Sequence, residues 1–152
     1  MKMKKIASLI LAGCMVLAAS VPAFAAQGLK EVHIMTVQER AAIVPLSTVT
    51  GRVLLPKTVA GKTGNPCAQF VADASHVSFT ITTAATASTY NVQLYQGTIA
   101  DGGSLVSSYN TLDVGVGVSI SDLEIGQSYY FVVSSLDAPA KGSNATYERI
   151  TF

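Results

Sequence analysis

The chain has 152 residues, of which 49% are hydrophobic and 12% are charged, and its formal net charge is +1. This length fits a single domain, and the high apolar content excludes intrinsic disorder, which requires low hydrophobicity and high net charge. Ten Lys and Arg against nine Asp and Glu exclude the basic composition typical of a nucleic-acid-binding protein. A mean hydropathy of +0.42 is high for a soluble domain, and it points to a membrane or targeting segment.

Residues 1–25 have the parts of a secretory signal peptide. A lysine-rich start is followed by an apolar run from Ile6 to Leu17 and by an A-x-A pattern that ends at Ala25. This arrangement predicts export and cleavage between Ala25 and Ala26. The apolar run is too short to span a membrane comfortably, so we expect no transmembrane span in the mature chain. Without residues 1–25 the net charge becomes −2.

An alternative processing site lies inside the apolar run. The sequence Leu11-Ala12-Gly13-Cys14 resembles the lipobox of bacterial lipoproteins, in which the cysteine is acylated and becomes the first residue. The residues after Cys14 continue the apolar run, whereas lipoproteins usually become polar there. Ordinary cleavage is therefore the favoured prediction. Either route predicts a bacterial protein that is secreted or held in the cell envelope.

The first part of the mature chain, residues 26–47, has a less regular pattern than the rest. Thr36 and Glu39 have the spacing of a capping box, which predicts one or two helical turns over Val37–Val44 as an alternative to extended chain. We expect an extended or partly helical segment here, ahead of a domain formed by residues 48–152.

From residue 48 onwards, β-branched and aromatic residues alternate with polar residues in short runs separated by turn residues. The predicted strands are Val49–Leu55, Val77–Thr82, Tyr90–Tyr95, Leu105–Tyr109, Val114–Ile120, Tyr129–Ser134 and Ala145–Phe152. Residues 56–66 are predicted to be a loop. Strands and turns at this spacing predict an all-β fold, a single antiparallel β-sandwich.

The most specific local pattern is Leu123-Glu124-Ile125-Gly126-Gln127-Ser128-Tyr129. It resembles the fibronectin type III signature L-x-P-G-x-x-Y, in which the chain turns a corner and a tyrosine hydroxyl bonds back to the backbone. By position, Leu123, Gly126 and Tyr129 match the corner residues, while Ile125 stands where that family has proline. The resemblance covers about residues 75–152 and implies a fibronectin type III-like or immunoglobulin-like sandwich. A second likeness, at Thr50–Pro56, is to the opening strand of prealbumin-like sandwiches of bacterial surface proteins.

The nucleophilic residues do not predict an enzyme. Asp73, Ser75 and His76 lie close together in the sequence, but His76 begins a predicted strand and no G-x-S-x-G elbow accompanies a serine. After cleavage Cys67 is the sole cysteine, and we expect a buried apolar side chain there rather than a disulfide between chains.

Metal and cofactor sites are not predicted either. One cysteine and two histidines exclude a standard zinc site in the mature chain. Four acids fall in predicted turns and offer oxygen ligands for Ca²⁺, but no D-x-D-x-D-G loop is present. These acids are Asp101, Asp113, Asp122 and Asp137. We therefore expect no catalytic, cofactor or metal site.

Tyr95 and Tyr130 are the candidate binding residues. Alternation turns both side chains away from the predicted core, and their strands are neighbours in fibronectin-like sheets. Two such rings can form a platform for a sugar. The other interpretation is a cross-strand pair of surface tyrosines, and the absence of tryptophan favours it.

Together these features predict an exported, non-catalytic module that binds a glycan, a host protein or another envelope component. One alternative is a structural subunit of a surface filament or matrix. In that case the subunits would join through an exposed edge strand such as Leu105–Tyr109, or through attraction between basic residues 26–66 and acidic residues 67–152. A further alternative is an inhibitor of a secreted enzyme that uses the loop at 56–66.

Overall fold

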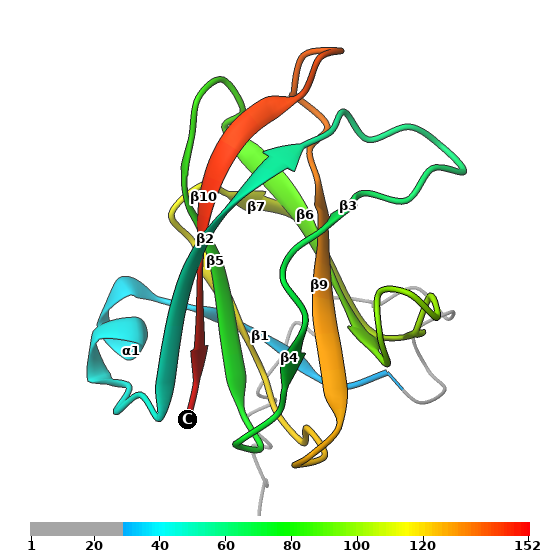
Figure 1. Cartoon of the computed structure of the whole chain (residues 1–152). Helices are drawn as coiled ribbons and strands as arrows, with labels where there is room; N and C mark the ends of the chain where they lie inside the picture. The colour runs from blue at the N-terminus through cyan, green and yellow to red at the C-terminus, as the bar shows by residue number, and fades with distance from the viewer. Residues whose placement is uncertain (1–28) are drawn as a thin grey trace, which may run out of the picture.

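The computed structural model describes residues 29–152, which form two antiparallel β-sheets packed face to face (Figure 1). The predicted all-β sandwich is confirmed, since strands dominate this part of the chain and α1 (Val37–Ala42) is short. The predicted signal cleavage between Ala25 and Ala26, and Cys14, lie outside the described residues.

The first sheet has the spatial order β1-β8-β5-β10-β2. Its strands are β1 (Val32–Met35), β8 (Gly117–Ile120), β5 (Val77–Ala84), β10 (Ser143–Thr151) and β2 (Ser47–Leu55). The second sheet has the order β3-β9-β6-β7, and β4 also pairs with β9. Its strands are β3 (Asn65–Pro66), β4 (Phe70–Val71), β9 (Ser128–Ser134), β6 (Thr89–Gln96) and β7 (Ser104–Asp113).

The core lies between the two sheets and is rich in aromatic rings. Phe79 of β5 and Phe131 of β9 face each other across the sandwich, with ring centroids 4.4 Å apart. Phe79 also stacks on Tyr147 of β10, and Phe131 stacks on Phe70 of β4. The strand alternation read from the sequence therefore places the correct faces of β5 and β9 inward.

Several predicted elements have different bounds in the structure; the predicted strand Leu105–Tyr109, for example, is part of the longer β7. The predicted strand Val114–Ile120 is wrong in its first half, because Val114–Val116 form a turn in which Gly115 has φ +96°. The apolar-polar alternation continues through this turn, so periodicity alone could not locate it. The predicted loop at 56–66 ends in β3, which pairs with β9.

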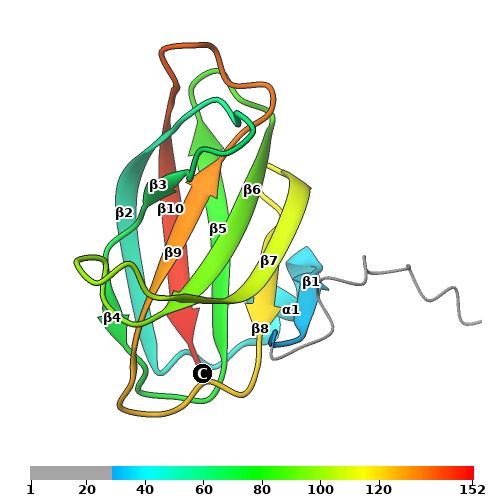
Figure 2. The ribbon, with the colours of Figure 1, turned by 90° about the vertical axis from the view of Figure 1, so that its right-hand side faces the viewer.

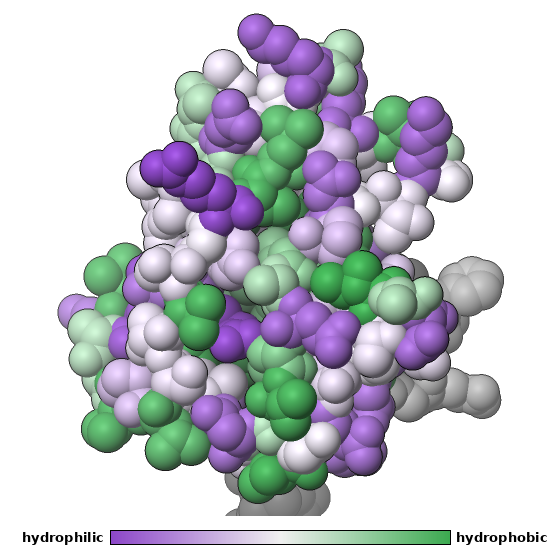
Figure 3. Space-filling model, in the orientation of Figure 1, coloured by the Kyte–Doolittle hydropathy of each residue, from purple (hydrophilic) through white to green (hydrophobic). Residues whose placement is uncertain are grey.

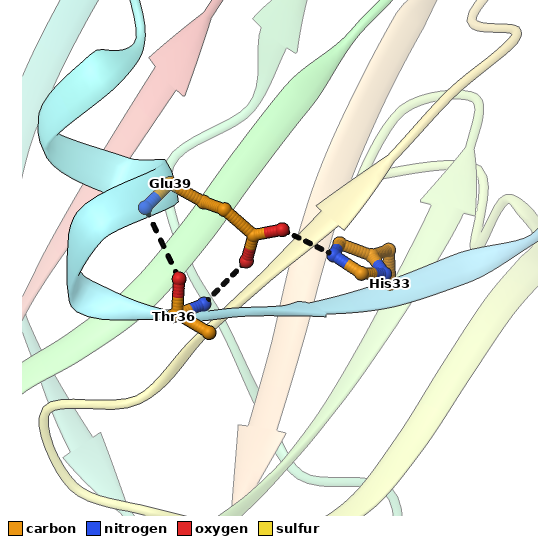
Figure 4. A network of polar contacts seen from close by, with 3 residues as sticks. All are labelled: His33, Thr36 and Glu39. Atoms are coloured by element: carbon orange, nitrogen blue, oxygen red, sulfur yellow. Dashed lines mark hydrogen bonds and ion pairs between the residues drawn. The ribbon is translucent and has the colours of Figure 1, made fainter.

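The N-terminal segment contains both extended and helical structure. β1 joins the first sheet by pairing with β8, so that sheet begins before residue 48. Helix α1 follows, and Figure 4 shows its capping box: the Glu39 N–H donates to the Thr36 hydroxyl, and the Glu39 carboxylate accepts from the Thr36 N–H. The same carboxylate lies 3.2 Å from Nε2 of His33. Arg40 of α1 forms an ion pair of 2.7 Å with Glu148 of β10.

On one side of the sandwich, the chain itself connects the two sheets. The Lys30 N–H donates to the Val106 carbonyl of β7, and the Ser107 hydroxyl donates to the Lys30 carbonyl. Directly afterwards β1 pairs with β8 of the other sheet. Figure 2 shows β1 and α1 on this side, with β2 on the opposite side of the molecule. We call the side with β1 and α1 the closed side and the side with β2 the open side.

Candidate functional site

The predicted corner residues meet at the turn between β8 and β9. The Tyr129 hydroxyl accepts a hydrogen bond of 3.0 Å from the Glu124 N–H, five residues back. Leu123 is buried beside them, and Gly126 has φ +87°, a conformation that glycine adopts without strain. Burial raises the pKa of the Tyr129 hydroxyl. This group of residues therefore fixes a turn and offers no open surface to a ligand.

Tyr95 and Tyr130 stand directly opposite each other on β6 and β9. Their ring centroids are 5.3 Å apart, and the ring planes differ by 11°. However, only 5% of Tyr130 is exposed. The turn between β6 and β7 covers it so closely that a Cβ on Gly103 would lie 3.0 Å from the Tyr130 ring. The two rings form a cross-strand pair, and Tyr130 lacks the open face that a sugar platform requires.

The residues that resemble a catalytic triad do not assemble one. The Ser75 hydroxyl lies 3.0 Å from Nδ1 of His76, but the two residues are adjacent in sequence and exposed. The His76 ring packs against Phe152, and Asp73 makes no hydrogen bond to the imidazole. Cys67 is buried, and desolvation raises the pKa of its thiol to about 12. A thiol of this kind is unreactive at neutral pH.

Three of the four acids lie on separate loops, and Asp113 is the last residue of β7. Asp137 accepts hydrogen bonds from Ser88, Thr89 and Ser135, and these donors hold the pKa of its carboxyl well below the usual range. Asp101 is bonded by the Thr98 hydroxyl. Within residues 29–152, no three His, Cys, Asp or Glu side chains are grouped closely enough to hold a metal ion.

The feature that sequence reasoning missed is the outer edge of β2 on the open side. All nine residues of β2 pair with β10, and β2 is the last strand of its sheet. Across the open side, the Asn65 side-chain amide donates a hydrogen bond of 2.8 Å to the Leu54 carbonyl. This contact shows that the Leu54 carbonyl points away from β10.

A second hydrogen bond also indicates that the Leu54 carbonyl points away from β10. Asn144 is the partner of Leu54 on β10, and its carbonyl accepts from the Ala85 N–H on the far side, toward β5. Neither residue of this pair therefore directs its carbonyl at the other. In an antiparallel strand the N–H and C=O of one residue point to the same side, and the side alternates along the strand.

It follows that Thr48, Thr50 and Arg52, which are in step with Leu54, direct their backbone N–H and C=O groups to the free edge. Their side chains are exposed. The free stretch ends where backbone groups are engaged, at the Leu46 N–H, which donates to the Thr151 carbonyl, and at the Leu54 carbonyl. Leu46 and Leu54 are themselves 66% and 41% exposed.

The other sheet edges in residues 29–152 are short or irregular. β3 and β4 have two residues each and β1 has four, while the ten-residue β7 pairs with β6 through two register shifts and is bonded by Lys30 at Val106. Natural edge strands are usually protected by lysine, proline, a bulge or a covering segment. Ser47–Leu55 contains neither lysine nor proline, and its pairing with β10 has a continuous register. The composition therefore does not mark this strand as an edge, and the sequence carried no signal for it.

An open depression lies beside this edge on the outer face of the first sheet. It is lined by polar side chains of Arg52, Asn144 and Thr146 around Leu54. Figure 3 shows the open side, where hydrophilic and apolar patches are interspersed. The depression adds side chains of mixed polarity to a strand edge with unpaired main-chain groups.

Comparison with known proteins gives no relative: no family model, no curated protein and no solved structure matches this chain. In the part of the chain that the structure describes, no helix is long and apolar enough to cross a membrane.

Proposed function

We propose that this protein is an exported, non-catalytic β-sandwich that binds another protein chain through the free edge of β2, at the cell surface or outside the cell. The observation that supports this is the row of unpaired backbone groups at Thr48, Thr50 and Arg52. An extended segment that adds to a sheet edge gains affinity from main-chain hydrogen bonds, and exposed alternate side chains supply specificity.

The signal-peptide pattern of residues 1–25 supports export. Protein binding is also better supported than sugar binding, because Tyr130 is covered whereas the β2 edge is exposed. A filament subunit requires two different contact surfaces. The edge strand predicted for that role, Leu105–Tyr109, has its Val106 carbonyl and Ser107 hydroxyl engaged by Lys30, so one binding edge is the favoured arrangement.

We further propose that the architecture is fibronectin type III-like in its central strands. β5 lies beside β8, and β9 lies beside β6, as the corresponding strands do in immunoglobulin-like sandwiches. The last strand differs. In those sandwiches it extends the sheet that contains the counterpart of β9, whereas β10 lies between β5 and β2 in the other sheet. This position of β10 makes β2 an outer strand.

The test is crosslinking of the exported protein, in cultures of the cells that produce it, to the protein chain bound at the β2 edge. Thr50→Pro removes one N–H from the free edge, and proline is tolerated where the N–H of an edge strand faces solvent. Thr50→Val keeps that N–H and is the matched control. We expect the wild type and Thr50→Val to give a crosslinked complex with a protein chain and Thr50→Pro to give none. Equal crosslinking of all three would contradict the proposal.

A further inference from the structure

We infer that the partner at the β2 edge is a second copy of this chain, paired antiparallel about a two-fold axis at Thr50. The inference rests on the proposed function, because it names the partner of the same edge. It follows from where the free backbone groups begin and end.

The free groups themselves determine the register. Thr48, Thr50 and Arg52 have N–H and C=O groups directed outward, while Leu46 and Leu54 have backbone groups already engaged. A two-fold axis at Thr50 pairs Thr50 with itself and Thr48 with Arg52 of the second copy. Each of these pairs exchanges both N–H···O bonds, as hydrogen-bonded pairs of antiparallel strands do.

Other registers lose this match. Moving the axis to Val49 or Gly51 places a free residue opposite Leu46 or Leu54, whose groups are engaged. Moving it to Arg52 places the two Arg52 side chains opposite each other, and like charges in that position are destabilising. The axis at Thr50 places each Arg52 opposite a neutral Thr48.

The side chains at the ends of the free stretch fit the same register. With the axis at Thr50, Leu46 of one copy lies opposite Leu54 of the other, at both ends of the paired strands. These leucines are 66% and 41% exposed in the single chain. Cross-strand apolar contact therefore removes exposed hydrophobic surface.

The incomplete burial of the inner face of β2 also favours pairing with a second copy. Its inward residues Val49, Gly51 and Val53 are only half-buried, because no further strand in residues 29–152 lies beyond them. A second β2 continues the first sheet across the axis and covers the ends of both cores. The two-fold contact uses the β2 edge of both chains, so it closes a dimer and does not propagate a filament.

The test is sedimentation equilibrium of the chain beginning at Ala26, which contains every strand of the described fold. Thr48→Glu places a carboxylate opposite Arg52 at both ends of the paired strands, and Thr48→Arg places a like charge there. We expect a monomer–dimer equilibrium in which Thr48→Glu tightens the dimer and Thr48→Arg weakens it, each about two- to tenfold in Kd. Thr63→Glu and Thr63→Arg make the same charge changes on an exposed loop and leave Kd unchanged.

Two results overturn the inference: a wild-type chain that stays monomeric up to about 1 mM, and Thr48 variants that shift Kd in the same direction. The proposed function fails separately. If the purified chain is monomeric but its crosslinked complex still depends on Thr50, the edge binds a different protein and the inference is wrong. If the purified dimer forms in the predicted register but crosslinking in the cell cultures does not depend on Thr50, the inference is supported and the proposed function fails.

Discussion

The closed and open sides of the sandwich differ in what covers their sheet edges. On the closed side, Lys30 bonds to β7 of one sheet and β1 then pairs with β8 of the other. On the open side, the hydrogen bond from Asn65 to Leu54 joins β3 to β2 at one end only. Within residues 29–152, the N-terminal segment thus contacts both sheets near their edges on the closed side, whereas no strand lies beside the outer edge of β2. The difference indicates that the open side is the one available for binding.

The core is also less enclosed on the open side than on the closed side. On the closed side the Tyr90 hydroxyl donates to the Val116 carbonyl, and burial raises the pKa of Tyr90. On the open side the interior admits an arginine: the Arg149 guanidinium carbon lies 4.1 Å from the centre of the Phe70 ring. Desolvation lowers the pKa of Arg149. Arg149 is only partly buried although its guanidinium packs on the ring face, so the core is less fully enclosed near β2.

Truncating a core side chain should cause the largest loss in the free energy of unfolding. The loss should be smaller for a side chain near the open side. Phe79→Ala is expected to lower the free energy of unfolding by about 4–5 kcal/mol, because Phe79 is fully buried between the sheets. Phe70→Ala, under Arg149 on the open side, is expected to cost about 3 kcal/mol because solvent can reach the space left. Urea unfolding measures both. A larger loss for Phe70→Ala would contradict the idea that the core opens toward β2.

Two strand glycines provide a sharper comparison between the sides. A Cβ on Gly51 would lie 2.4 Å from the Tyr147 ring on the open side, and a Cβ on Gly117 would lie 2.3 Å from the Thr80 hydroxyl on the closed side. At Gly51 three atoms of the Tyr147 ring and hydroxyl, held by Phe79, lie within 2.6 Å of the added Cβ, whereas at Gly117 only the hydroxyl of the buried Thr80 comes that close. We expect Gly51→Ala to cost about 2–3 kcal/mol and Gly117→Ala about 1 kcal/mol. Thermal unfolding of the two variants checks this, and the reverse order would show that Tyr147 can move.

The contribution of Asp137 to the stability of the fold should depend on pH. Hydrogen bonds from Ser135, Ser88 and Thr89 lower the pKa of Asp137 in the folded chain. This group therefore contributes stability that is present above its unfolded pKa of about 3.9 and is lost as pH falls below that value. We expect Asp137→Asn to be less stable than the wild type at pH 7, with the difference shrinking toward pH 2. Asp113→Asn is the control, and a difference that stays at its full size at pH 2 would exclude the charge as the cause.

The smallest effect is expected at the helix on the closed side. Thr36→Ala removes the hydroxyl that accepts from the Glu39 N–H, and loss of such a cap costs about 0.5–1 kcal/mol. Helix α1 contains no buried residue, so the loss should remain local. Amide exchange of Arg40, whose N–H donates to the Thr36 carbonyl, should accelerate while exchange in β5 is unchanged. Gln38→Ala should leave both unchanged.

Much of the fold followed from short-range patterns in the sequence. The alternation in Val77–Thr82 and Tyr129–Ser134 identified two core strands, and Thr36 with Glu39 located the start of α1. These features depend on residues a few positions apart, which the sequence displays directly.

The candidate site could not be predicted in the same way, because it depends on the order of strands. Nothing near Ser47–Leu55 reveals that β10 pairs on one side and no strand on the other. Likewise, the exposure of Tyr130 depended on a turn from another strand, at Gly103. The strand alternation gave the direction of the Tyr130 side chain but not what covers it.

Residue-resolved amide hydrogen exchange along β2 tests the central claim most directly. In dilute solution the account predicts fast exchange at Thr48, Thr50 and Arg52 and slow exchange at Val49 and Gly51, because backbone groups alternate between the free edge and β10. At high concentration the three fast amides should become protected together. Uniform protection of all five amides in the dilute monomer would show that the β2 edge is not free.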